Sequence, residues 1–314
     1  MIETHPHDPA DGIAPLVSIV TVTWNSAGVI PGILRSIHST LAPESYELIV
    51  IDNGSKDGTV DLVHQLAPEA AVIANPRNRG LAAANNQGLD AAKAEFIVIC
   101  NPDVLFKSGA VTEMLQVMTR HPSAGWVVPR QRHEDGRLLT TAGDLPTLSE
   151  ALLGRTLAGW SSQGTTQGQW WDGWAHDEER AIPRGQEAVY MIRRAALEQV
   201  GPQDERYVLD WEGPDWTDRF RKAGWEIWLA PAAEVVHLGG TSVRQARLRW
   251  IASTHRGMYY YFSDRLPKPS RPVLAATICL RALVKMVGAV GGLPLYRWAH
   301  GAATTRAPRQ RASN

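Results

Sequence analysis

Short runs of apolar, β-branched residues alternate with amphipathic stretches along the first 120 residues of the chain. The runs are typical of buried strands, and the stretches between them carry apolar residues at helical spacing. The strands are predicted at Val17–Thr23, Glu47–Ile51, Ala71–Ala74 and Glu95–Cys100. The helices are predicted at Val29–Ser39, from about Val60 with Thr59 as its cap, at Leu81–Ala92 and at Gly109–Arg120. This alternation indicates an α/β fold with a mostly parallel, Rossmann-like sheet covered by helices on both faces.

The second half of the chain is less regular. Its predicted strands are Trp126–Pro129, Ala188–Ile192 and Glu226–Ala230, and its predicted helices are Arg194–Val200, Asp215–Ala223 and about Val243–Phe262. Residues 131–184 are rich in Gly, Thr and Trp and show little periodicity, which predicts a functional insertion on the acceptor side rather than a second core. We therefore expect a flexible N-terminus (1–14), one α/β domain (15–264) and a C-terminal helical tail (265–314).

Charge is unevenly distributed along the chain. Lys+Arg and Asp+Glu both number 32, yet no acidic residue follows Asp264 and nine basic ones do. The apolar part of this tail, Val273–Trp298, is interrupted by Arg281 and Lys285, which are four apart and so share a helical face. We expect a basic amphipathic tail that either lies on an anionic membrane surface or packs on the α/β domain.

Several classes of protein are disfavoured by what the sequence lacks. The N-terminus is polar and acidic, unlike a signal peptide, and no run of about 18 uncharged apolar residues predicts a spanning helix. The two cysteines, Cys100 and Cys279, have the spacing of neither a zinc site nor a structural disulfide. We therefore expect a cytoplasmic protein, peripheral at most on the inner face of the membrane.

Polar clusters follow three of the predicted strands, where a parallel sheet binds its ligands. They are Thr23-Trp24-Asn25, Asp52-Asn53-Gly54-Ser55 and Asn101-Pro102-Asp103. A carboxylate after the second strand suits the N–H of a pyrimidine base or a ribose hydroxyl. Asp103 suits a divalent cation held against a diphosphate, and Mg²⁺ or Mn²⁺ is the expected ion because both favour hard oxygen ligands.

The two common glycine-rich phosphate cradles are missing. No G-x-G-x-x-G follows the first strand, and G-x-x-x-x-G-K-[ST] does not occur. A bound diphosphate would therefore need a metal ion or basic side chains, for which Arg77, Asn78 and Arg79 are candidates.

Six segments, in order and spacing, carry a family resemblance over Val17 to about Ser242. They read VSIVTVTWNS, ELIVIDNGSKDGT, NPRNRGLAAANNQGL, FIVICNPDVLF, AVYMIRRAALEQVGPQDERYVLDWEGPDWTDRFRKAGW and APAAEVVHLGGTS. The sequence resembles the family-2 glycosyltransferases with the GT-A fold, especially their bacterial rhamnosyltransferase-like branch.

The resemblance implies a role for individual residues of this chain. Asn101-Pro102-Asp103 would be its form of the D-x-D metal motif, with Asp103 the main ligand, and His237 matches a position that helps to bind metal or diphosphate. The residues that it places around the nucleotide or donor sugar are Thr23, Asn25, Asp52, Asn78, Arg79, Gly80 and Asn101.

One departure from the family pattern concerns the catalytic base. Many relatives have Glu-Asp-x-Asp where this chain has Glu212-Gly213-Pro214-Asp215, so Gly213 stands at the position of the aspartate often assigned as the base. Inverting transfer needs a carboxylate that takes the proton of the acceptor hydroxyl. Glu212 and Asp215 are the leading candidates, Asp210 is the next, and the sequence does not separate the first two.

The resemblance implies a metal-dependent inverting glycosyltransferase of cell-surface polysaccharide synthesis. Its donor would be a dTDP- or UDP-sugar, with dTDP-rhamnose leading, its acceptor a glycan or lipid-linked glycan, and a nucleic acid would not be a partner. Two alternatives stay open: a sugar-phosphate nucleotidyltransferase, for which TWNSAG is a poor phosphate loop, and a sugar-binding relative that has lost its base.

Overall fold

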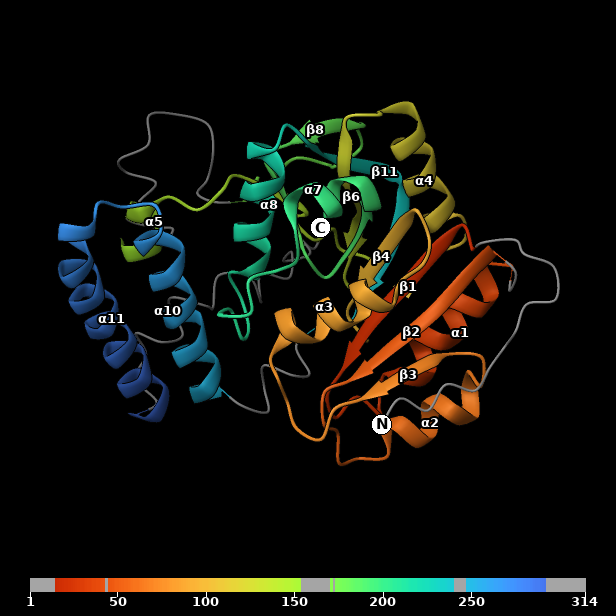
Figure 1. Cartoon of the computed structure of the whole chain (residues 1–314), viewed down its shortest axis with the longest axis horizontal. Coiled ribbons are helices and arrows are strands. Elements are labelled where there is room, and N and C mark those ends of the chain that lie inside the picture. Colours follow the sequence, from red (N-terminus) through yellow and green to blue (C-terminus); the bar gives the residue numbers. More distant parts are fainter. Residues whose placement is uncertain (1–14, 43–44, 154–169, 172, 240–246, 292–314) are drawn as a thin grey trace, which may run out of the picture.

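The computed structural model describes residues 15–42, 45–153, 170–171, 173–239 and 247–291. The expected flexible N-terminus, the middle of the 131–184 insertion and the last part of the tail lie outside the described residues. The described chain forms a mixed α/β structure around one central sheet, as the sequence pattern predicted (Figure 1).

The central sheet has nine strands in the order β3-β2-β1-β4-β10-β6-β11-β5, with β8 also paired to β11. Strands β1 to β4 pair in parallel, and β11 pairs in parallel with β6, whereas β10, β5 and β8 run antiparallel to their neighbours. A short β7–β9 pair stands apart. The strands are β1 Val17–Thr23, β2 Tyr46–Asp52, β3 Ala71–Ala74, β4 Phe96–Cys100, β5 Val104–Phe106, β6 Ala124–Arg132, β7 Ala142–Gly143, β8 Arg180–Ile182, β9 Arg184–Gly185, β10 Val189–Arg193 and β11 Glu226–His237.

Helices cover both faces of this sheet (Figure 1). One apolar core lies under α1, α2 and α4, and a second core, which contains Trp126, Trp216 and Phe220, lies under α3, α7 and α8. The described helices are α1 Ile30–Thr40, α2 Thr59–Leu66, α3 Leu81–Ala91, α4 Ala110–Arg120, α5 Leu148–Leu153, α7 Arg194–Val200, α8 Glu212–Lys222, α10 Arg247–Ser263 and α11 Arg271–Gly291.

The structure corrects two local expectations. Thr59 is not a cap: it is the first residue of α2, where its hydroxyl hydrogen-bonds the Asp57 carboxylate and accepts the Ser26 N–H. Helix α8 begins at Glu212 and not at Asp215, because proline is tolerated in the first turn of a helix, where its missing N–H has no partner to lose. The earlier start puts Glu212 at the helix N-terminus.

Helices α10 and α11 pack together at one end of the molecule (Figure 1). Leu274 and Ile278 of α11 are buried against α10 in a third apolar core. The outer side of α11 is apolar, with exposed fractions of 55 to 70% at Val273, Leu280, Leu283, Val284 and Val287. None of the described helices has the length and hydropathy needed to cross a bilayer.

Arg281 and Lys285 do not point to solvent on this outer side. Both are half-buried, and Arg281 contacts Met258 of α10. Burial lowers the pKa of both groups, that of Lys285 to about 8. The described face of the tail helix is therefore apolar rather than basic.

Candidate functional site

The loops after β1 and β2 form one hydrogen-bonded unit at the carboxyl edge of the sheet. Thr23 and Asp52 end these neighbouring strands in register, and the Thr23 hydroxyl donates to Asp52 Oδ1 at 2.9 Å. Asp52 Oδ2 accepts the backbone N–H groups of Gly54 and Ser55 at 3.1 and 2.9 Å. Asp52 is 2% exposed, and its hydrogen bonds with Thr23, Gly54 and Ser55 hold the loop in its conformation.

Asn25 joins this unit from the first loop. It has a left-handed backbone with φ of 50°, which asparagine tolerates better than most residues. Its Oδ1 accepts the N–H of Lys56, and its own N–H donates to the Ser55 hydroxyl at 2.8 Å. Asn25 is thereby held next to the Asp52 loop, as predicted for two loops at one edge of a parallel sheet.

Asn53, which belongs to the polar cluster after the second strand but was not among the predicted nucleotide-binding residues, connects this loop to residues 78–80. Its amide nitrogen donates to Asn78 Oδ1 and to the Gly80 carbonyl, both at 3.1 Å, and its oxygen accepts the Arg79 N–H at 2.9 Å. The loops meet so closely that a Cβ on Gly54, which has φ of +84°, would lie 2.8 Å from the Arg77 backbone. The loop residues after β1, β2 and β3 thus share one surface.

Basic side chains border this surface. Arg77 and Arg79 are exposed, and neither guanidinium forms an ion pair or hydrogen bond with another described residue. Two cations without carboxylate partners beside polar loops suit an anionic ligand such as a diphosphate.

Asp103 and His237 meet at the next part of the same edge. Strand β5 follows Asp103 and pairs with the end of β11, so that Val104 lies opposite His237. The distance from His237 Nε2 to Asp103 Oδ1 is 3.3 Å. Asp103 is 6% exposed, and its Oδ1 is buried without a hydrogen-bond partner. Asn101, half-buried, lies two residues before Asp103 and is fixed by its N–H bond to the Ala188 carbonyl at 2.8 Å.

Asp103 and His237 are suitable ligands for a divalent cation whose other ligands come from a bound substrate. A buried carboxylate oxygen that makes no hydrogen bond is costly unless a charged neighbour or a ligand satisfies it, and here His237 Nε2 lies 3.3 Å away. Among the described residues, no three His, Cys, Asp or Glu side chains gather into a closed metal site. Mg²⁺ in particular is often held by one or two carboxylates together with substrate phosphates.

A cavity of about 500 Å³ opens at the N-terminus of α8. Trp170, Trp211 and Trp250 line it together with the acidic residues Asp210 and Glu212. Asp210 and Trp211 both have left-handed backbones, with φ of 63° and 71°, although neither is glycine. Strain of this kind persists where the surroundings enforce it and is frequent at functional sites. Here α10 enforces it, because Thr254 donates to Asp210 at 2.6 Å and Trp211 packs on Gly257.

The two predicted base candidates occupy different environments. Burial and the neighbouring Asp210 carboxylate raise the pKa of Glu212 to about 8, and Glu212 Oε2 is buried without a partner. Burial also raises the pKa of Asp210. Asp215 does not line the cavity: Arg219 and Arg265 hold its two oxygens at 3.1 and 3.2 Å.

Arg184 and Glu187 also line the cavity, although neither was among the residues predicted from the sequence. Arg184 Nε and a terminal nitrogen contact the two Glu187 oxygens at 2.8 and 3.2 Å, and its guanidinium lies 4.6 Å from the centre of the Trp170 ring. The sequence predicted a strand at Ala188–Ile192 but not its direction, and the structure shows that β10 pairs with β4 in antiparallel orientation. An antiparallel strand presents its amino end to the edge where the parallel strands end, so Glu187, just before β10, reaches the site.

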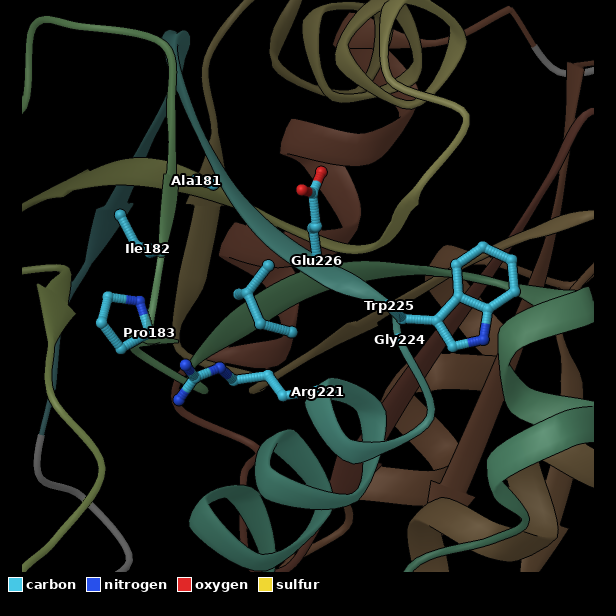
Figure 2. Close-up of a pocket in the computed structure, with 8 residues that line it drawn as sticks. Ala181, Ile182, Pro183, Arg221, Gly224, Trp225 and Glu226 are labelled. Atoms are coloured by element: carbon cyan, nitrogen blue, oxygen red, sulfur yellow. The ribbon is translucent and has the colours of Figure 1, made fainter.

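A second cavity, of about 390 Å³, lies elsewhere, around the C-terminus of α8 and the beginning of β11. Figure 2 shows the Arg221 side chain beside Pro183, while the Trp225 and Glu226 side chains point away. Glu226 accepts hydrogen bonds from Ser123 and Trp228, so this cavity has no cluster of free catalytic groups. It lies at the amino end of β11, opposite His237.

Comparison with known proteins identifies the family. Residues 18–177 match the family model described as glycosyl transferase family 2. The chain belongs to this family. An N-acetylglucosaminyl-diphospho-decaprenol L-rhamnosyltransferase of Mycobacterium tuberculosis is 27% identical over 282 residues, which cover 85% of this chain and 92% of the relative. The succinoglycan biosynthesis protein ExoO of Rhizobium meliloti is 34% identical over 111 residues, which cover 34% and 31% of the two chains.

Solved structures agree on the fold of this family-2 glycosyltransferase. A mannosyltransferase from Pyrobaculum calidifontis, in complex with GDP-Man and Mn²⁺, has a TM-score of 0.57 at 19% identity and covers 93% of this chain and 85% of its own. TarS residues 1–349 of S. aureus, in complex with UDP, has a TM-score of 0.53 at 14% identity, with coverage of 90% and 76%. The predicted family and the GT-A fold are confirmed, and the mycobacterial relative is a rhamnosyltransferase, in line with the predicted resemblance to that branch.

Proposed function

We propose that this family-2 glycosyltransferase is a metal-dependent inverting enzyme that transfers a sugar from a nucleoside diphosphate to a lipid-linked glycan. The observation that carries the proposal is the buried Asp103 Oδ1, which makes no hydrogen bond and lies 3.3 Å from His237 Nε2, at the sheet edge that also holds the Thr23, Asn25 and Asp52 loops. The leading donor is dTDP-rhamnose, with UDP-sugars next, because of the likeness to the mycobacterial rhamnosyltransferase.

Asp103 and His237 would hold Mg²⁺ or Mn²⁺, which neutralises charge on the leaving diphosphate. The nucleotide would lie over the joined loops, where Thr23 and Asp52 order one wall and Asn78, Arg79 and Gly80 the other. Asn101, between the loops and Asp103, would face the donor sugar. Arg79, exposed and without a partner, would contact phosphate or sugar oxygens.

The acceptor would enter the cavity at the start of α8. Tryptophan rings and carboxylates together suit a sugar, because the rings cover its apolar faces and the carboxylates bind its hydroxyls. The catalytic base would be a carboxylate of this cavity, for which Glu212 and Asp215 are the candidates from the sequence. Asp215 is paired with two arginines outside the cavity, so Glu212 is the better placed of the two.

A lipid-linked acceptor would bring the protein to a membrane surface, and the exposed apolar side of α11 suits that contact. A helix that presents valines and leucines outward lies well at the boundary of lipid headgroups and acyl chains. We place the enzyme at the cytoplasmic face of the membrane, where the apolar side of α11 and the basic residues near the C-terminus would contact anionic lipid.

The proposal is tested with a panel of nucleotide sugars. Release of nucleoside diphosphate is measured with Mg²⁺, with Mn²⁺ and with excess chelator, in the presence of N-acetylglucosaminyl-diphospho-polyprenol. We expect turnover with a dTDP- or UDP-sugar that stops in chelator, and calorimetry in which dTDP or UDP binds more tightly than GDP. Donor binding without turnover would instead support a sugar-binding protein.

A further inference from the structure

The position where relatives have their base aspartate is Gly213 here, and another carboxylate fills the space beside it. A Cβ on Gly213 would lie 2.4 Å from Cδ and Cγ of Glu187 and 2.5 Å from its Oε1. Such distances do not occur between real atoms, so any residue larger than glycine at 213 would require the Glu187 side chain to leave its observed position. Glycine at 213 thus makes room for a glutamate that arrives from a different element of the fold.

We propose that Glu187 is the general base of this glycosyltransferase and replaces the carboxylate absent at Gly213. The inference rests on the proposed function, since it assigns a role within the transfer reaction. It differs from the candidates that the sequence offered, both of which lie on α8.

Access to the cavity favours Glu187 over the other carboxylates. Its side chain is 24% exposed and lines the cavity. Glu212 Oε2 is buried, and Asp210 is held by Thr254 within a strained turn. Asp215 lies outside the cavity in its pair of arginine contacts. Glu187 is therefore accessible to a sugar hydroxyl in the cavity, whereas Glu212 Oε2 is buried.

The surroundings also hold Glu187 in one orientation. Arg184 contacts both carboxylate oxygens, a two-pronged geometry that fixes position as well as charge. Arg184 is itself fixed by Trp170 on the face of its guanidinium. Because burial raises the pKa of Glu212 to about 8, that neighbouring carboxyl is largely protonated at neutral pH and cannot take a proton from the acceptor.

The backbone places Glu187 near the proposed diphosphate site. The next residue, Ala188, accepts the N–H of Asn101, which lies two residues before Asp103. Strand β10 then pairs with β4, with Val189 opposite Cys100. An acceptor hydroxyl at Glu187 is thus next to the sheet edge where the donor would lie.

In the proposed step, the Glu187 carboxylate takes the proton of the acceptor hydroxyl while the oxygen of that hydroxyl forms a bond to the anomeric carbon of the donor sugar. The bond from that carbon to the diphosphate oxygen breaks on the opposite face, and its electron pair leaves with the diphosphate. The configuration at the carbon is inverted, and Glu187 ends the step protonated.

The first test is Glu187→Gln, which keeps the shape and removes the charge. We expect kcat for transfer to fall by about 10²-fold or more, the usual scale for a general base, with metal-dependent UDP or dTDP binding unchanged. Glu179→Gln is the matched control. Glu179 is 27% exposed and also takes two contacts from one arginine, Arg120, away from the cavity.

Two further variants separate a base from a residue that only positions Arg184. In Glu187→Ala, added formate should restore part of the transfer rate by supplying a small carboxylate, whereas Glu179→Ala should not respond. The double variant E187G/G213D returns the carboxylate to the position seen in relatives and should transfer faster than Glu187→Gln. A structural role would instead be indicated if Glu187→Gln lost donor binding, formate did not rescue Glu187→Ala and the double variant did not recover activity. This combination would overturn the inference.

Failure of the inference differs from failure of the proposed function. If the wild-type protein transfers sugar and Glu187→Gln keeps its rate within about threefold, far from the scale of a lost base, Glu187 is not the base. A wild-type protein that neither binds nor cleaves any nucleotide sugar refutes the proposed function, and the inference with it.

Discussion

Replacing Glu212 with Gln should change how the stability of the protein depends on pH. The folded chain holds a proton on Glu212 up to about pH 8, whereas an ordinary glutamate releases it near 4.5. Between these values the native state binds a proton that the unfolded state has lost, so the wild-type free energy of unfolding falls as pH rises. Glutamine resembles the protonated side chain at every pH and removes this dependence.

The size of the effect follows from the same values. Each pH unit between 4.5 and 8 is worth up to about 1.4 kcal/mol, which gives an upper limit on the order of 5 kcal/mol over the whole interval. Burial is the largest cause, and the charges of Asp210 and Glu187 act in the same direction while Arg184 opposes them. Tyr190, itself buried, faces the same group. Relaxation of the site will reduce the measured value below the limit.

Urea unfolding followed by tryptophan fluorescence, from pH 5 to pH 9, measures the difference between variant and wild type. We expect near-equal stabilities at pH 5 and a growing advantage of Glu212→Gln toward pH 8. Glu234→Gln is the control with the opposite sign, because Arg132 and Arg130 lower the pKa of Glu234 against its burial. That variant should be less stable at neutral pH, with the difference lost in acid. A Glu212→Gln difference that stays constant across the range would refute the reasoning.

Two other predictions concern metal and membrane. Asp103→Asn should lower the transfer rate by about 10²-fold or more, and calorimetry should show that UDP or dTDP binding no longer depends on metal. The urea unfolding of this variant should stay near that of the wild type. Activity that stays high in Asp103→Asn would mean that the metal binds elsewhere. The double change Leu280→Ser and Val284→Ser should weaken flotation with anionic vesicles by at least about 10-fold, since a fully buried Leu or Val contributes about 1.5–3 kcal/mol. Leu66→Ser, at a 40% exposed leucine of α2, is its control, and equal losses in both would deny α11 a specific role.

The strands and helices of the first 100 residues were predicted from the sequence within one or two residues. This part is regular because each buried parallel strand is a continuous apolar run and each helix has one apolar face. Local pattern and tertiary structure agree there. The short strands β5, β7, β8 and β9 were not predicted, because a segment of two or three residues is too short to show a hydrophobic periodicity. Their pairing depends on contacts with segments distant in the sequence.

The position of several candidate residues at one edge of the sheet was predicted for a related reason. Thr23, Asn25, Asp52 and Asp103 follow strands whose direction the pattern revealed, so their common edge could be foreseen. His237 depended on the family resemblance, and the structure shows the cause of its position, the pairing of β11 with β5 beside Asp103. The exclusion of a side chain at Gly213 by Glu187 could not be foreseen, because it joins two segments that no local pattern connects.

The helix pair α10–α11 joins the cavity at the start of α8 to the apolar outer surface. Trp250 and Thr254 of α10 line the cavity, and Thr254 holds Asp210 in its strained conformation. Met258, Tyr261 and Phe262 of α10 form one apolar core with Leu274 and Ile278 of α11, and the outer side of α11 stays apolar and exposed. A helix pair that only stabilised the α/β domain would gain nothing from exposed leucines and valines, since surface positions of such helices are usually polar. The arrangement therefore favours a surface that meets lipid while the adjacent cavity receives the sugar end of the same lipid-linked acceptor.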